Sequence, residues 1–160
     1  MKNRYTKAGF TLIEVLISVS IVGLLASLTL VSFGGTQKSA RDTQRKSDLK
    51  QYAAALENYA TQNSSLYPSR TVASGTSLAT TVCTDMALTS CPEDPKNSND
   101  SSYSYKYQSD GSGSGAKNGT KFVLWAKIEK STDYWIVCSD GKVGVKTQSG
   151  FSVSGGVCPI

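Results

Sequence analysis

Few residues of this chain are suited to catalysis. The sequence has no histidine, which removes both the commonest general base and the commonest metal ligand of proteins. Its serines, threonines and cysteines therefore lack the usual partner that activates a nucleophile. We expect no enzymatic activity, and with it no catalytic residue and no cofactor.

The cysteines are the other residues with a chemistry of their own, and there are four: Cys83, Cys91, Cys138 and Cys158. Their number is even and they contain no C-x-x-C pair, so the paired short spacings of a zinc site are missing. Outside the cytoplasm, an even set of this kind forms disulfides. We therefore expect two disulfides, in one of three possible connectivities, and no bound metal.

Glu14 is the one charged residue in the apolar stretch that covers residues 10–33. The uncharged part that follows it has 19 residues and would span about 28 Å as a helix, close to the roughly 30 Å hydrocarbon core of a bilayer. The first nine residues contain no acid and three cations: Lys2, Arg4 and Lys7. The positive-inside rule then puts these nine residues in the cytoplasm and the chain after the stretch outside it.

Two simpler interpretations of this stretch compete, a cleavable secretory signal and an anchor helix with no further role. A secretory signal has an apolar region of about 7–15 residues, which is shorter than this one. Neither interpretation accounts for Glu14, because a carboxylate in a membrane costs several kcal/mol unless it is paired. An acid at this position predicts a cationic partner.

The sequence around this acid, Lys7-Ala8-Gly9-Phe10-Thr11-Leu12-Ile13-Glu14-Val15-Leu16, resembles the leader and helix start of type IV prepilins and pseudopilins. The resemblance implies that a prepilin peptidase removes residues 1–9 by cutting between Gly9 and Phe10. It implies that the same enzyme methylates the new amine of Phe10. It also implies that Glu14 meets the N-terminal ammonium of a neighbouring subunit as a filament grows.

The function that this resemblance implies is structural. We expect a type IV pilus subunit that assembles through its N-terminal helix into a helical extracellular filament, used for adhesion, twitching motility or DNA uptake. The alternative is a pseudopilin of a type II secretion or competence apparatus. Before assembly, the protein would be a single-pass protein of the inner membrane, and its partners would be the prepilin peptidase, an inner-membrane assembly platform and further copies of itself.

The apolar pattern continues beyond Gly34-Gly35 at spacings of three and four, which predicts an amphipathic helix over residues 34–62. We expect one helix from Phe10 to Gln62, with residues 10–33 in the membrane or the filament core. The other faces of its second half carry charged residues, which we interpret as a solvated surface with local ion pairs such as Asp42 to Lys46. Contacts between subunits are the alternative interpretation of these charges.

Residues 63–160 are expected to form a small globular head. Four segments favour strands: Ser102–Gln108, Lys121–Glu129, Tyr134–Ser139 and Lys142–Thr147. Asp140-Gly141 predicts a tight hairpin between the last two, and the Gly/Ser-rich residues 110–120 predict a mobile loop. One long helix packed on a small antiparallel sheet gives an α+β fold that is similar to that of type IV pilins.

Within this head we favour the local disulfides Cys83–Cys91 and Cys138–Cys158. The second would hold the tail to the sheet, as a C-terminal disulfide loop does in many pilins. Acids in the loops could bind calcium, as some pseudopilins do in a comparable region, although no EF-hand spacing occurs. These acids are Asp85, Glu93, Asp94, Asp100 and Asp110.

DNA is a possible partner that the sequence does not indicate. Beyond residue 9, 14 cations face 12 acids, which is no excess of the kind that nucleic-acid-binding proteins show. Alternating tyrosines at positions 103, 105 and 107 could stack on single-stranded nucleic acid, but one buried strand face gives the same pattern. Six lysines could form a basic patch, although we prefer scattered surface charge: Lys117, Lys121, Lys127, Lys130, Lys142 and Lys146.

Overall fold

The computed structural model describes residues 9–160, without the side chains of residues 28–32. The chain divides into an N-terminal unit that ends at Gln37 and a head unit, Lys38–Ile160. Helix α1 (Leu12–Gln62) begins in the first unit and ends in the second. The helix expected from Phe10 to Gln62 is therefore present, and it begins two residues later than expected.

The end of α1 is fixed by its own polar groups. The Asn63 side-chain amide donates to the Tyr59 carbonyl (2.7 Å), and the Ser65 N–H donates to the Ala60 carbonyl (2.8 Å). Ser64 and Ser65 have φ of 57° and 63°, the left-handed conformation that often closes a helix. These bonds satisfy carbonyls that a helix end otherwise leaves without partners.

The described side chains of the N-terminal unit are exposed, including large apolar ones such as Phe10, Leu12 and Ile13. Among the described residues, no helical stretch is both long and apolar enough to qualify as a membrane crossing. The stretch expected in the membrane, residues 10–33, includes residues 28–32, whose side chains lie outside the described set. The expected leader, residues 1–9, lies outside it except for Gly9.

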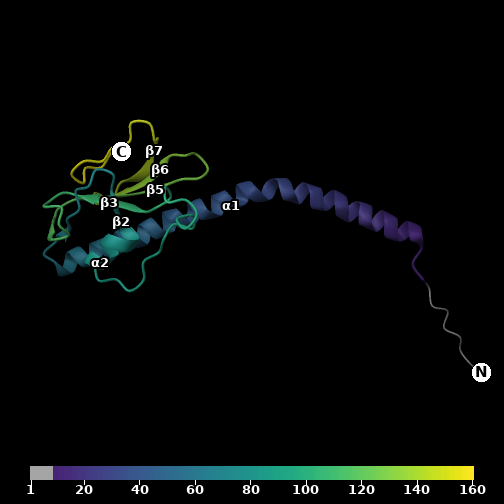
Figure 1. Ribbon diagram of the computed structural model, residues 1–160, viewed down its shortest axis with the longest axis horizontal. Helices are drawn as coiled ribbons and strands as arrows, with labels where there is room; N and C mark the ends of the chain where they lie inside the picture. Colours follow the sequence, from purple (N-terminus) through teal and green to yellow (C-terminus); the bar gives the residue numbers. More distant parts are fainter. Residues whose placement is uncertain (1–8) are drawn as a thin grey trace, which may run out of the picture. The chain divides into compact units, whose positions relative to one another are not determined.

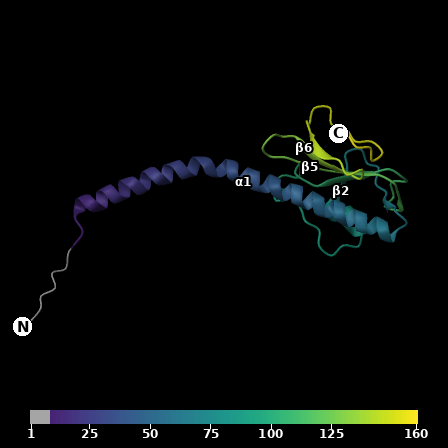
Figure 2. The ribbon, with the colours of Figure 1, turned by 180° about the vertical axis from the view of Figure 1, so that it is seen from behind.

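The head unit is a five-stranded antiparallel sheet in the order β2-β3-β5-β6-β7, with the second half of α1 against one face (Figures 1 and 2). Its strands are β2 (Thr76–Ser77), β3 (Lys106–Ser109), β5 (Phe122–Lys127), β6 (Tyr134–Cys138) and β7 (Val143–Lys146). A separate two-stranded ladder joins β1 (Tyr67–Pro68) to β4 (Lys117–Gly119). The predicted α+β fold, a helix packed on an antiparallel sheet, is confirmed.

Alternate side chains of the sheet enter two separate cores because neighbouring residues of a strand point to opposite faces. On the helix side, residues from α1 and the sheet form the larger core, among them Leu49, Tyr52, Leu56, Tyr107, Leu124 and Val137. On the other face, the C-terminal tail covers the smaller core, which includes Val123, Trp125, Ile136, Phe151 and Val153. The tail is thus a structural layer of the head.

The predicted strands differ from the observed ones mainly at their ends. Strands β5, β6 and β7 lie inside the predicted segments, and the predicted hairpin is present at Asp140-Gly141. There the Gly141 N–H donates to the Cys138 carbonyl (3.1 Å), and Gly141 has φ of 84°, which favours glycine. The strand predicted at Ser102–Gln108 is shorter, because only Lys106–Ser109 pairs with neighbouring strands.

Residues 110–120, expected as a mobile loop, contain β4 and a network of hydrogen bonds. The Ser69 hydroxyl donates to the Asp110 carbonyl (2.8 Å) and accepts from the Gly113 N–H (2.7 Å). A Cβ at Gly111 would lie 2.5 Å from the Asn118 side-chain oxygen, so the small residue is needed for this close approach. The glycines of this loop allow tight packing.

The segment between β2 and β3 begins with helical turns. A π-helix, η1 (Leu78–Val82), leads into the short helix α2 (Cys83–Asp85). Leu78 and Val82 are buried in the larger core. This anchors the start of a long connection that crosses α1.

Candidate processing and assembly site

Helix α1 begins with a capping box formed by Thr11 and Glu14. The Glu14 carboxylate accepts hydrogen bonds from the Thr11 N–H (3.1 Å) and hydroxyl (2.9 Å), and the Glu14 N–H donates to the Thr11 hydroxyl oxygen (3.3 Å). This reciprocal pattern is the one that a T-x-x-E sequence makes at a helix N-terminus. We did not predict it from the sequence, although the signal Thr11-Leu12-Ile13-Glu14 was there.

Glu14 is a charged residue among apolar side chains. Phe10, which precedes the helix, and four helix residues surround a hollow of about 370 Å³: Glu14, Val15, Ser18 and Val19. Apart from the carboxylate and one hydroxyl, its lining is hydrocarbon. The carboxylate is the only charged group among the side chains that line this hollow.

Three serines of this apolar segment, among those whose side chains the structure describes, are satisfied within the helix. The hydroxyls of Ser18, Ser20 and Ser27 donate to the carbonyls of residues 14, 16 and 24 at 2.7 to 2.8 Å. Such bonds let a polar side chain sit on an apolar surface without requiring an external partner. Glu14 therefore differs from these serines, since its charge needs compensation from outside the helix in an apolar medium.

Gly9 and Phe10, the expected cleavage and methylation positions, precede the helix and are exposed. The backbone at the bond between them is not part of a helix or strand. A peptidase could reach this bond without first unwinding α1.

The head contains a buried ion cluster centred on Arg45, whose relative exposure is 0%. Its guanidinium donates two hydrogen bonds to Asp94 (2.6 and 2.8 Å) and one to Asp42 (2.7 Å), and it contacts Glu129 at 2.8 Å. Burial opposes the charge, but the three carboxylates outweigh it and raise the pKa of Arg45 above its ordinary value. The cluster joins α1 to the connection before β3 and to the turn after β5.

Glu129 and Asp42 make further contacts outside the Arg45 guanidinium. Arg41 donates two hydrogen bonds to the Glu129 carboxylate (2.6 and 2.7 Å), and together with Arg45 it lowers the pKa of Glu129 to about 2. The Asp42 carboxylate accepts the backbone N–H groups of Glu129 (2.8 Å) and Lys130 (3.1 Å). Asp42 is thus bound to Arg45 and not to Lys46 as predicted. The predicted solvated face is wrong for the buried Asp42, Arg45 and Asp48, whereas Lys50 and Glu57 are exposed.

The three alternating tyrosines are buried and do not form an open stacking surface. Tyr105 donates its hydroxyl to Asp48 (2.7 Å) and Tyr107 to the Pro68 carbonyl (2.6 Å). Burial is the main cause that raises the pKa of both hydroxyls.

Tyr103 instead lies against cations, with Lys96 Nζ at 4.4 Å and Lys127 Nζ at 4.9 Å from its ring centre. The core interpretation of this pattern therefore fits the structure.

The loop acids considered for calcium have separate partners. Asp85 accepts two hydrogen bonds from Arg70 (2.7 and 2.8 Å), and Asp94 pairs with Arg45. Asp110 accepts the backbone N–H of Lys121 (3.1 Å). These acids are distributed over different parts of the head and serve its packing.

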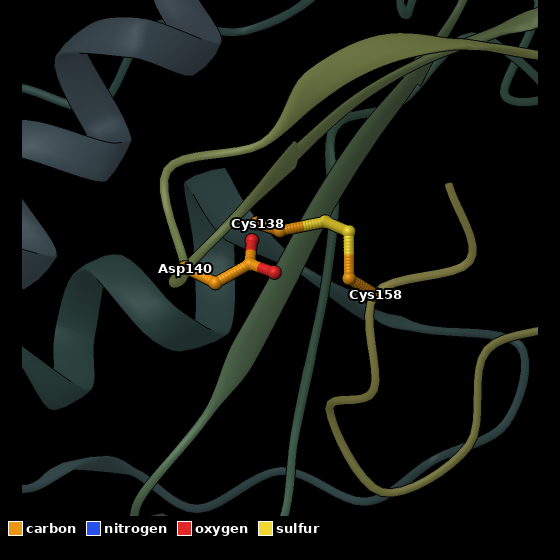
Figure 3. A group of neighbouring side chains, drawn as sticks. All are labelled: Cys138, Asp140 and Cys158. Atoms are coloured by element: carbon orange, nitrogen blue, oxygen red, sulfur yellow. A yellow bond between two sulfur atoms is a disulfide. The ribbon is translucent and has the colours of Figure 1, made fainter.

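Disulfides join Cys83 to Cys91 and Cys138 to Cys158, the local pairing that we favoured from the sequence. Figure 3 shows the second bridge, which links the end of β6 to the C-terminal tail beside Asp140. The two sulfurs and an Asp140 oxygen lie within 4.8 Å of one another, as metal ligands do. Because both sulfurs are bonded to each other, neither is a thiolate that could hold a metal.

The comparisons with known proteins give one family match and two curated relatives. The family described as "Prokaryotic N-terminal methylation motif" matches residues 4–30. The chain is 41% identical over 66 residues to type II secretion system core protein G of Pseudomonas aeruginosa, a match that covers 41% of this chain and 46% of that protein. It is 35% identical over 65 residues to the core protein G of Pectobacterium carotovorum subsp. carotovorum, covering 41% of each.

The match thus spans less than half the length of these curated relatives. No solved structure gives a significant match. The methylation motif covers Gly9, Phe10 and Glu14, and the similarity to core protein G extends over 66 and 65 residues in the two relatives. The chain thus carries the N-terminal methylation motif of prepilin-like proteins and is similar over part of its length to type II secretion system core protein G.

Proposed function

We propose that this protein is a pseudopilin, a structural subunit of the filament of a type II secretion or competence apparatus. The observation that carries the proposal is the 41% identity to a type II secretion core protein G, together with the methylation motif at residues 4–30. The subunit starts as a single-pass protein of the inner membrane. A prepilin peptidase cuts between Gly9 and Phe10 and methylates the amine of Phe10, and an assembly platform then adds the subunit to a filament of further copies.

The chemistry of residues 10–33 explains why assembly is favourable. The N-terminal unit exposes a large apolar surface, which leaves water or lipid when helices of several copies pack together. The new ammonium of Phe10 and the carboxylate of Glu14 are each costly to bury alone in such a bundle. When the ammonium of one copy meets Glu14 of a neighbour, both costs are offset, and the register between the helices is defined.

The head unit supplies a rigid outer part to each subunit. Its two disulfides and the Arg45 cluster hold α1, the connections and the tail together. A stiff head suits a filament that must transmit force along its length. The head itself contains no catalytic arrangement in this proposal.

A type IV pilus subunit, which we expected first from the sequence, is the second candidate. The observation that favours it is that the methylation motif at residues 4–30 does not distinguish the two kinds of subunit, and the similarity to core protein G covers only 66 residues of the chain. Immunogold microscopy separates the two functions. A long surface filament built of this protein supports the pilus. The pseudopilin is supported if no surface filament is seen and if deletion of the protein abolishes protein export.

The assembly role of Glu14 is tested with two variants. Glu14→Ala removes both the capping box and the charge, whereas Glu14→Gln keeps a side chain that can complete the capping box but removes the charge. We expect both variants to be cleaved like the unsubstituted protein and to lose roughly tenfold or more of their filaments, because an unpaired ammonium in an apolar bundle costs several kcal/mol. Filament yield is measured by shearing and immunoblotting.

The Gln variant decides between the two roles of this side chain. If Glu14→Gln assembles as well as the unsubstituted protein while Glu14→Ala does not, the carboxylate only caps the helix. Normal assembly of both variants would contradict the proposal for this residue altogether.

A further inference from the structure

We propose that the heads of neighbouring copies bind each other in one direction, with strand β7 of one copy against the loop that carries Leu88 of the next. We call these surfaces the β7 ledge (Val143, Val145 and the hollow beside them) and the Leu88 loop (residues 86–93). The inference rests on the proposed function, since it concerns copies already gathered in a filament. It adds a contact between heads to the contact between N-terminal helices.

The β7 ledge lies at an open edge of the sheet. Strand β7 pairs only with β6 in the five-stranded sheet. Val143 lies opposite Val137 and Val145 lies opposite Trp135, so both valines are on the helix side of the sheet. Val137 belongs to the larger core, but Val143 and Val145 remain 44% and 48% exposed. The opposite edge strand, β2, has only two residues and runs directly into η1. An exposed apolar edge strand of this kind is a ready surface for another chain.

A basic hollow adjoins these valines. It has a volume of about 300 Å³, and Val145, Ile128, Lys46 and Lys130 are among the residues that line it. Lys130 is exposed, and the Lys46 ammonium lies 4.6 Å from the ring centre of Trp135. Asp42, the acid beside the hollow, already accepts two backbone N–H groups and the Arg45 guanidinium. The free charge of the hollow is therefore positive.

The Leu88 loop presents an apolar side chain on a rigid base. The Cys83–Cys91 disulfide closes the loop, the Leu88 N–H donates to the Cys83 carbonyl (3.1 Å), and Ala87 has φ of 53°. Leu88 is nevertheless 37% exposed, beside a groove of about 350 Å³ that Tyr52, Ala55 and Pro92 help to line. Glu93 follows in the sequence and is exposed. A loop that carries both an exposed leucine and an exposed acid complements a ledge that carries valines and lysines.

The two surfaces lie on opposite sides of α1 within the head. The hollow touches α1 at residues 39, 42, 43 and 46, and the Leu88 groove touches it at residues 51, 52 and 55. At 3.6 residues per turn these two sets point about half a turn apart, and their centres are separated by about 15 Å along the axis. In Figures 1 and 2 the connection after α2 likewise lies across α1 from β6 and β7.

This placement decides the kind of assembly. Two different surfaces on opposite sides make a head-to-tail contact, which can continue from copy to copy along a filament. Pairing of β7 with β7 would instead close a two-fold dimer and stop growth. The axial offset also matches a stack in which each copy is displaced along the helix direction relative to its neighbour.

Disulfide cross-linking in assembled filaments tests this contact. All four native cysteines are already paired, so the double variant Leu88→Cys/Val145→Cys adds the only free thiols of the full chain. We expect a ladder of dimers, trimers and higher multimers on oxidation, and monomers from each single variant. Val72→Cys/Val145→Cys is the matched control, because Val72 is a valine of similar exposure (53%) outside both surfaces.

The outcomes separate this inference from the proposed function. Filaments that form without a Leu88–Val145 ladder, or with an equal ladder in the Val72 control, overturn the head contact and leave the proposed function standing. Dimers from Val145→Cys alone indicate two-fold β7 pairing and also overturn it. If the unsubstituted chain forms no filament, the proposed function itself fails and this inference falls with it. Should the first pair disturb folding, Glu93→Cys/Lys130→Cys, two exposed positions of the same surfaces, gives the same test.

Discussion

At the residue scale, the guanidinium of Arg45 is the buried charge on which the packing of the head depends. Its side chain is 1% exposed and is surrounded by Asp42, Asp94 and Glu129, whose side chains are at most 8% exposed. Arg45 is the cation that all three carboxylates share, while Arg41 also pairs with Glu129 and two backbone N–H groups also bind Asp42. If the Arg45 guanidinium is removed, each of these three buried acids loses a cationic partner.

We therefore predict that Arg45→Ala lowers the free energy of unfolding by roughly 3–5 kcal/mol, the usual cost of breaking a buried ion pair from one side. Urea unfolding of the full chain in detergent, followed by tryptophan fluorescence, measures this because both tryptophans lie in the head. Lys50→Ala, at an exposed position of the same helix, is the control and should change stability by less than about 0.5 kcal/mol. Equal effects of the two variants would contradict the role of the cluster.

The sequence could not reveal this cluster. Arg41, Asp42 and Arg45 have the spacing of ordinary surface ion pairs on a helix, and nothing in that pattern marks a buried guanidinium. The partners that bury it, Asp94 and Glu129, follow 49 and 84 residues later in the chain. In contrast, Glu14 could be singled out from the sequence because every residue around it is uncharged.

At the element scale, Glu129 links the turn after β5 to the start of the head part of α1. Arg41 and Arg45 lower its pKa from the ordinary 4.5 to about 2, and its side chain is only 3% exposed. A carboxyl whose pKa is lower in the folded state than in the unfolded state stabilises the fold above its unfolded pKa. That contribution is lost as the pH falls from about 5 to about 2, because the unfolded state takes up the proton more readily than the folded state over this range.

The expected size of this loss is roughly 3 kcal/mol, from about 1.4 kcal/mol per unit of pKa. Urea unfolding between pH 7 and pH 2 should show the unsubstituted chain losing stability over this range. Glu129→Gln should be less stable at pH 7 and should have a shallower slope, since the group no longer titrates. Identical slopes for the two proteins would mean that other carboxyls determine the acid sensitivity.

The elements could be predicted from the sequence to different degrees. The helix, the strands β5 to β7 and their hairpin follow from local patterns, namely apolar periodicity and Asp140-Gly141. The strands β1, β2 and β4 have two or three residues each, too few to produce a pattern. The glycine-rich composition of residues 110–120 predicts a loop, and it gives no sign of β4 or of the hydrogen bonds that Ser69 makes with this segment.

At the scale of the whole molecule, the N-terminal unit and the head are built on different principles. The head buries its own apolar residues in two cores and is closed by two disulfides. The N-terminal unit leaves its described apolar side chains exposed, so its stability depends on a lipid or protein environment. In our account, processing at the Gly9–Phe10 bond is the step after which the N-terminal unit moves from the lipid of the membrane to the protein core of a filament.

The N-terminal peptide of the cell-associated protein tests the central claim most directly. Mass spectrometry should find a peptide that begins at Phe10 and carries one methyl group on its amine, an added mass of about 14 Da, as the methylation motif predicts. A chain that still begins at Met1, or one cut within or after the apolar segment, would contradict the account. Glu14 would then have no ammonium to meet, and the chain could not assemble in the way proposed here.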